Sequence, residues 1–255
     1  MAPYARRQVL GGLAGLPLAA ILADTRRARA AAAGLTPVSL QISGGRQVSA
    51  ALAVPESTPA PAVVLIHEWW GLNDRIKTVA AEFASEGYLA LAVDLYDGDV
   101  TTSPDDARTY MQRVDAATAT ETLSGWTAWL RAHESGSGKV GTIGWSFGGG
   151  WSLNASIATP VNATVVYYGR VNRQAADLAN LEGPVLGHFA TRDKWIAAEM
   201  VTAFEAEMTK AGRSFEAHWY DADHGFDNPT GARYDQANAQ LAWARTLAFF
   251  KAHLT

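Results

Sequence analysis

Short runs of β-branched and apolar residues alternate with longer helical segments from Pro37 to the end of the chain. The run Ala62 to Ile66 is apolar throughout, as expected of a strand that is buried on both faces of a parallel sheet. Strands that alternate with helices are typical of an α/β fold. The sequence therefore predicts a mainly parallel central sheet flanked by helices on both faces, within a single domain over residues 34–255.

Two antiparallel strands are expected at one edge of this sheet, because Ser39 to Ile42 and Gln47 to Val54 are joined by a Ser-Gly-Gly turn. The other strands are expected at 62–66, 88–93, 140–144, 163–168, 185–190 and 215–220. Helices are expected at 75–85, 105–114, 117–133, 147–158, 197–211 and 234–253. Residues Ser135 to Gly138 are predicted to form a turn.

Residues 1–33 are predicted to be an export signal. Arg6 and Arg7 precede a weakly hydrophobic run from Val9 to Ala23, and Ala28 to Ala31 offers the small residues of a cleavage site. This arrangement resembles a twin-arginine signal, which would direct the protein to the periplasm or outside the cell. An amphipathic helix is the alternative, but the charges lie at both ends of the run. Since a membrane span needs about 20 apolar residues, we expect cleavage and no membrane attachment afterwards.

The composition argues against several classes of binding partner and cofactor. The net charge is -4, so the chain lacks the basic excess that binding to nucleic acid or to an anionic membrane would favour. There is no cysteine, which excludes disulfides, thiolate metal sites and a thiol nucleophile. His67-Glu68 begins like the zinc motif H-E-x-x-H, but Gly71 replaces the second histidine. We therefore expect a small-molecule substrate, no metal and no cofactor, and we take a monomer as the default.

Gly144-Trp145-Ser146-Phe147-Gly148 fits G-x-S-x-G between an expected strand and an expected helix. The sharp turn at such a motif holds the serine in a strained backbone conformation, and side chains two residues before and after it would collide. Its geometry exposes the hydroxyl and directs the Phe147 N–H and the helix N-terminus toward a developing oxyanion. The alternative is a glycine-rich turn that merely begins a helix, so the motif needs partners.

Asp193 and His224 are the candidate partners. A serine hydroxyl needs a base to remove its proton, and the base needs a carboxylate to orient it. Both residues follow Ser146, in the order serine, acid, histidine, and each lies just beyond the carboxyl end of an expected strand. Asp221 and Asp223 are rival acids, but they share the loop of His224. The sequence therefore predicts a Ser146, His224 and Asp193 triad.

From about residue 37 to the end, the chain resembles the dienelactone hydrolases. The resemblance is carried by His67-Glu68-Trp69-Trp70-Gly71-Leu72-Asn73, Asp94-Leu95-Tyr96, Gly144 to Gly149, Tyr167-Tyr168-Gly169, Asp193 and His224-Gly225-Phe226. It implies an α/β-hydrolase fold and hydrolysis of a carboxylic ester or lactone by a nucleophile, histidine and aspartate triad. It also implies that the backbone N–H of Trp69 is a second oxyanion donor beside that of Phe147.

The chain departs from the family at two places. The family usually has a cysteine nucleophile, with a glutamate beside it that corresponds to Glu68, whereas this chain has Ser146. The family also binds a substrate carboxylate with two arginines, at the positions that Gly98 and Asn228 occupy here. A neutral, partly apolar substrate is therefore expected, and Arg192 is a conceivable substitute for those arginines.

Four aromatic residues near the motifs are candidates for the substrate pocket: Trp70, Trp145, Trp195 and Tyr96. For Trp70 and Trp145, packing in the core is an equally good interpretation. Two functions remain open. The chain is either a serine-dependent hydrolase of esters or lactones, or an exported relative of the family that binds a ligand without turning it over.

Overall fold

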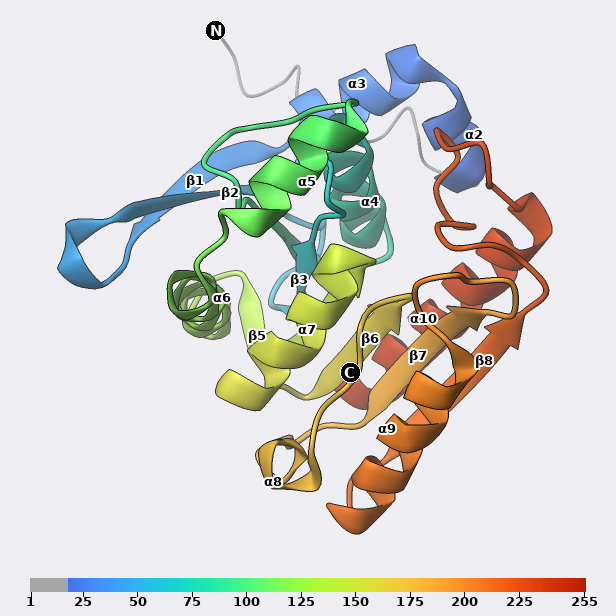
Figure 1. The fold of residues 1–255 in the computed structure, drawn as a ribbon. Helices are drawn as coiled ribbons and strands as arrows, with labels where there is room; N and C mark the ends of the chain where they lie inside the picture. The colour runs from blue at the N-terminus through green and yellow to red at the C-terminus, as the bar shows by residue number, and fades with distance from the viewer. Residues whose placement is uncertain (1–17) are drawn as a thin grey trace, which may run out of the picture.

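The computed structural model describes residues 18–255, and in them eight strands form one sheet in the order β1-β2-β4-β3-β5-β6-β7-β8 (Figure 1). Strands β1, β2 and β4 pair antiparallel and all other neighbours pair parallel. The strands are β1 (Thr36–Gln41), β2 (Gln47–Ala53), β3 (Ala60–Ile66), β4 (Leu89–Val93), β5 (Gly136–Trp145), β6 (Ala163–Tyr167), β7 (Val185–Ala190) and β8 (Phe215–Tyr220). The predicted parallel sheet with an antiparallel edge is confirmed.

Helices cover both faces of the sheet (Figure 1). They are α2 (Leu18–Ala23), α3 (Thr25–Ala33), α4 (Asp74–Ser85), α5 (Pro104–Gln112), α6 (Ala116–Arg131), α7 (Phe147–Ala158), α8 (Ala175–Leu178), α9 (Ala198–Lys210) and α10 (Gln236–Leu254), and a 3-10 turn spans Ser43–Gly45. Alternate residues of β3 face opposite sides: Val63 and Leu65 pack with α4 and α10, while Val64 and Ile66 pack with α6. This is why the strand is apolar throughout.

Helix α4 follows the sheet's central strand β3 and has a clear beginning and end. Its N-cap is Asn73, whose side-chain oxygen accepts a hydrogen bond from the N–H of Ile76. It ends at Ser85, as expected, with Glu86 as its C-cap, and Gly87 directly after it takes a positive φ of 90°. Arg75 lies one turn before Val79 and is buried with it. The first turn of the helix therefore carries a charge toward the interior.

Strand β5 begins earlier than expected, and the predicted turn at Ser135 to Gly138 is wrong. Gly136 pairs with Ala60 of β3, and Val140 pairs with Ala62, so three residues of β5 lie opposite one residue of β3. Gly138 provides the positive φ of 86° within this irregularity. The two glycines therefore form a bulge within the strand, where the sequence was interpreted as a turn.

Helix α3 packs against the body of the domain although its sequence was assigned to the export signal. Ala28 and Ala31 are buried, and Thr78 of α4 donates a hydrogen bond to the carbonyl of Ala28 at 2.9 Å. The packed domain therefore extends N-terminal to residue 34. Arg6 and Arg7 lie outside the described residues, and the export signal stays a prediction. Within residues 18–255, no helix combines the length and apolar character needed to cross a membrane.

Candidate active site

Ser146 lies at a sharp bend between β5 and α7. Its backbone has φ 53° and ψ -113°, a conformation that L-residues adopt only under strain. A Cβ on Gly144 would lie 2.0 Å from the carbonyl oxygen of Gly148, and a Cβ on Gly148 would lie 2.2 Å from that of Ile66. The two glycines thus permit close approach of three backbone segments, which confirms the steric reason for them.

The structure brings together the three residues of the predicted triad. Ser146 Oγ and His224 Nε2 are 2.8 Å apart, and His224 Nδ1 and Asp193 Oδ2 are 2.7 Å apart. Asp193 lies just after β7 and His224 just after β8, so neighbouring parallel strands deliver both to the edge where β5 ends. When the Nδ1–H of His224 donates a hydrogen bond to Asp193, Nε2 carries no proton and can accept the proton of Ser146.

Asp193 is held as a carboxylate. Burial alone would raise its pKa, but the hydrogen bond and charge of His224, together with the N–H groups of Trp195 and Ile196, lower the pKa below the ordinary aspartate value. Those two N–H groups bond to Asp193 Oδ1 at 2.8 and 3.0 Å. The carboxylate is therefore ionised at neutral pH and fixed in direction, as a group that orients a histidine must be.

The rival acids have another partner. Asp221 and Asp223 both pair with Arg192, and all three side chains reach solvent. Arg192 is therefore committed to the loop of His224. This removes it as a substitute for the arginines that bind a substrate carboxylate elsewhere in the family.

Two backbone N–H groups beside Ser146 have no acceptor among residues 18–255. They are those of Phe147, the first residue of α7, and Trp69, in the loop after β3. The close packing of Gly148 against the carbonyls of Ile66 and His67 holds this loop against the start of α7. Two free donors on segments that pack against each other at the start of α7 are what an oxyanion hole requires.

A buried ionic cluster, which the sequence did not reveal, is formed by residues that neighbour the triad and the Trp69 loop in the sequence. Arg75 donates to Asp227 Oδ2 at 2.8 Å and to Glu68 Oε2 at 3.5 Å. The same oxygen of Glu68 accepts from Asn228 Nδ2 at 2.9 Å, and Trp145 Nε1 donates to Asp227 Oδ2 at 2.9 Å. Burial raises the pKa of Asp227 to about 7, against the lowering effect of Arg75. Glu68 is thus turned toward this cluster rather than bonded to Ser146.

One signal could have revealed Arg75. Arg75, Val79 and Phe83 repeat at helical spacing, and the latter two are apolar, so the pattern places a charge on the buried face of α4. A charge that is forced inside must find partners of opposite sign. The identity of those partners, Glu68 and Asp227, depends on loops that come together only in the fold.

The aromatic residues proposed for the pocket separate into different environments. Trp145 as a pocket wall is wrong: it is only 1% exposed, because its ring lies under Arg75 and its indole N–H is bonded to Asp227. Trp195 is 53% exposed and its ring lies edge-on to His224, with centroids 5.0 Å apart. Trp70 is half-buried and packs against Trp69, with the two rings tilted by 59°. Tyr168, not singled out for the pocket, packs on His224 at 5.0 Å.

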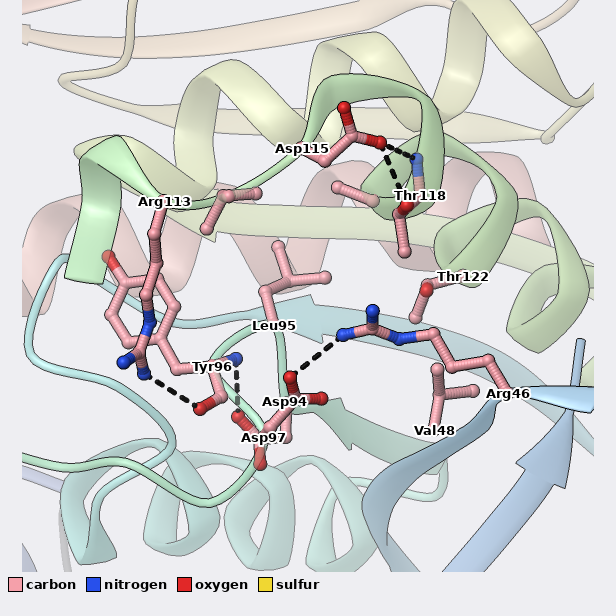
Figure 2. Close-up of a pocket in the computed structure, with 12 residues that line it drawn as sticks. Arg46, Val48, Asp94, Leu95, Tyr96, Asp97, Arg113, Asp115, Thr118 and Thr122 are labelled. Atoms are coloured by element: carbon pink, nitrogen blue, oxygen red, sulfur yellow. Dashed lines mark hydrogen bonds and ion pairs between the residues drawn. The ribbon is translucent and has the colours of Figure 1, made fainter.

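Tyr96 lines a pocket that contains no triad residue. Its ring contacts His67 and Phe147, with centroids 4.7 and 5.6 Å away. This pocket of about 230 Å³ lies between the loop after β4, the start of β2 and the first turns of α6 (Figure 2). Two cations, Arg46 and Arg113, line this pocket, but no triad residue does. The pocket is therefore not the place where a substrate would meet Ser146.

His67, the first residue of the incomplete zinc motif, has a structural role. It is fully buried, and burial lowers its pKa. Its Nδ1 lies 2.6 Å from the carbonyl of Glu68, and its Nε2 accepts from the N–H of Leu95 at 3.1 Å. A neutral imidazole thus joins the loop after β3 to the loop after β4.

The sheet order, the strained bend after β5 and the site at the carboxyl ends of the strands define an α/β-hydrolase fold. Residues 48–254 match the family model described as "Dienelactone hydrolase family". The chain belongs to the dienelactone hydrolase family, as its motifs indicated.

Two curated relatives and one solved structure illustrate the similarity. Protein usf of Aquifex pyrophilus is 32% identical over 224 residues, covering 83% of this chain and 96% of that protein. A carboxymethylenebutenolidase of Pseudomonas putida is 26% identical over 226 residues, covering 83% and 94%. The metagenomic dienelactone hydrolase-like promiscuous phosphotriesterase P91 is 24% identical with a TM-score of 0.78, covering 87% of this chain and 99% of that one. The last likeness supports the fold alone.

Proposed function

We propose that this member of a hydrolase family cleaves a carboxylic ester or lactone, with Ser146 as nucleophile, His224 as base and Asp193 as the group that orients the base. The observation that carries the proposal is the continuous line of hydrogen bonds from Asp193 through His224 to Ser146 Oγ. The strained backbone of Ser146 supports it, because strain of this kind gathers at reacting groups.

The reaction follows from this geometry. Ser146 Oγ attacks the carbonyl carbon while its proton passes to His224 Nε2, and the oxyanion accepts hydrogen bonds from the N–H groups of Phe147 and Trp69. The bond from that carbon to the leaving oxygen then breaks, and His224 returns the proton to the leaving alkoxide. Water attacks the acyl group on Ser146, giving its proton to His224, which protonates Ser146 Oγ as the acid is released.

A neutral acyl group or lactone ring is the proposed substrate class. The two positions where the family has carboxylate-binding arginines hold Gly98, whose N–H bonds to Asp94, and Asn228, whose amide bonds to Glu68. Trp195 offers a half-exposed aromatic ring beside His224, with the guanidinium of Arg233 over one face. We propose further that the enzyme acts after export, as a monomer.

The test is covalent labelling. Incubation of the protein with a fluorophosphonate should give one adduct, located on Ser146 by mass spectrometry, and Ser146→Ala should abolish it. With a neutral ester or lactone, Ser146→Ala should lower kcat by roughly 10⁶. Labelling elsewhere, or turnover that survives in Ser146→Ala, contradicts the assignment. Tight binding of a lactone with neither labelling nor turnover would instead indicate an exported binding relative of the family.

A further inference from the structure

Three segments that carry the proposed chemistry meet at one buried guanidinium. The loop after β3 contributes Glu68, directly before Trp69, and β5 contributes Trp145, directly before Ser146. The loop after β8 contributes Asp227, three residues after His224. Arg75 contacts all three: it pairs with both carboxylates, and its Cζ lies 5.4 Å from the centre of the Trp145 ring.

We infer that Arg75 is a positioning residue of the active site, which sets the oxyanion loop, the nucleophile and the base relative to one another through Glu68, Trp145 and Asp227. The inference rests on the proposed function. Arg75 does not touch Ser146 or His224 itself, so it acts through the residues beside them.

The charged groups of the cluster are buried, so the loss of any one of them is costly. The side chain of Arg75 is 3% exposed, and those of Glu68 and Asp227 are 6% and 13% exposed. Charges removed from water are stable only when paired, so removing the cation leaves Glu68 and Asp227 without their shared partner in the interior and breaks the link between their loops. The loops that carry them would then move apart or take up water. The donors of Trp69 and the ring of His224 would move with them.

The contacts are also specific to a guanidinium. Arg75 uses its two terminal nitrogens for different partners, Nη1 for Glu68 and Nη2 for Asp227, and it lies over an indole face. The planar guanidinium of arginine can bond to two carboxylates and stack on an aromatic ring at once, whereas the ammonium of lysine is a single point charge on a shorter side chain. A lysine at this position would keep the charge balance and lose part of the geometry.

The experiment compares three variants with the wild type in kcat, KM and melting temperature. Arg75→Met removes the cation, and Arg75→Lys keeps the charge. The triple variant Arg75→Met/Glu68→Gln/Asp227→Asn removes all three charges and so relieves the electrostatic cost. Arg245→Met is the control, because Arg245 also lies over an aromatic ring, that of Tyr220, and bonds to its hydroxyl, but forms no hydrogen bond or ion pair with a triad residue.

In Arg75→Met we expect kcat to fall by at least about 100-fold with a smaller change in KM, since displacement of a catalytic group by about 1 Å has an effect of that size. Arg75→Lys should recover part of kcat. The triple variant should recover the melting temperature while its kcat stays low, because charge balance is restored but the links between the loops are not. Arg245→Met should keep the wild-type kcat.

Two results would overturn the inference. One is a folded Arg75→Met protein with the kcat of Arg245→Met. The other is a triple variant in which kcat recovers together with the melting temperature, which would mean that Arg75 only balances charge. Both differ from failure of the proposed function, in which the wild type itself shows neither labelling of Ser146 nor turnover.

Discussion

Gly148→Ala tests whether contact between α7 and β3 sets the active-site geometry. The added methyl would lie 2.2 Å from the carbonyl oxygen of Ile66 and 2.4 Å from that of His67. Both obstacles are backbone atoms, so no side chain can rotate away. Since uncompressed contacts begin at 3.4 Å, the start of α7 must move from the end of β3 by about 1 Å or more. That movement separates the N–H of Phe147 from the N–H of Trp69.

The matched control is Gly150→Ala, two residues later in the same helix. There the nearest atom to the new methyl is the carbonyl oxygen of Arg170 at 3.4 Å, which is an ordinary contact. Neither Gly148 nor Gly150 has a positive φ, so backbone strain does not distinguish them. Alanine favours a helix over glycine by up to about 1 kcal/mol, whereas overpacking costs about 1 to 3 kcal/mol. The two substitutions should therefore change stability in opposite directions.

The assays are thermal unfolding and the rate of fluorophosphonate labelling at Ser146. For a chain of this size 1 kcal/mol corresponds to about 2 to 4 °C in Tm, so we expect Gly148→Ala to melt about 2 to 12 °C lower than the wild type. Its labelling rate should fall by roughly 100-fold, the effect of a displacement near 1 Å. Gly150→Ala should melt no lower than the wild type and label at its rate. Equal behaviour of the two variants would refute the steric argument.

Three further outcomes are expected. Asp193→Asn should lower kcat by roughly 10⁴ with little change in Tm, because His224 loses the carboxylate that fixes its tautomer; a loss below tenfold in steady-state kinetics would contradict this. Burial raises the pKa of Glu82 from 4.5 to about 7. Between these two pH values Glu82 is protonated in the folded chain and ionised in the unfolded chain, so the free energy of unfolding falls as the pH rises to 7. In urea unfolding, the free energy of unfolding of Glu82→Gln minus that of the wild type should therefore increase between pH 5 and 8. A difference that does not change with pH would contradict this prediction. A chain beginning at Leu35 should melt below one beginning at Leu18, because it lacks the buried Ala28 and Ala31 of α3; equal melting would show that α3 adds nothing to the domain.

The elements predicted best from sequence are those whose ends carry a clear signal. Strands β7 and β8 and helix α7 have the expected bounds, because Thr191-Arg192-Asp193 follows β7, Asp221 follows β8 and Thr159-Pro160 follows α7. Strand β5 begins four residues before its predicted start, since glycines at 136 and 138 permit a turn and a bulge equally well. Helix α8 has only four residues, too few to produce a periodic pattern.

The candidate site could be predicted to the extent that its residues are tied to strand ends. Ser146, Asp193 and His224 each follow a strand of a parallel sheet, so their meeting follows from the topology. The environment of an aromatic side chain is not fixed in this way. Trp145 and Trp195 both lie close to triad residues in the sequence, yet one is buried under Arg75 and the other is half exposed beside His224.

The buried cluster also bears on the proposed use of a serine nucleophile where the family usually has a cysteine. Glu68 bonds to Arg75 and Asn228, so its charge is balanced within the cluster and is not directed at Ser146. A serine that passes its proton to His224 needs one base, and a second carboxylate near Oγ would oppose the negative charge that develops in the transition state. Arg75 is the cation that bonds to Glu68, and Asn228 adds a neutral donor to the same oxygen. The contribution of Arg75 to the rate should therefore be larger with Ser146 than in a Ser146→Cys variant, whose thiolate forms before the substrate is attacked.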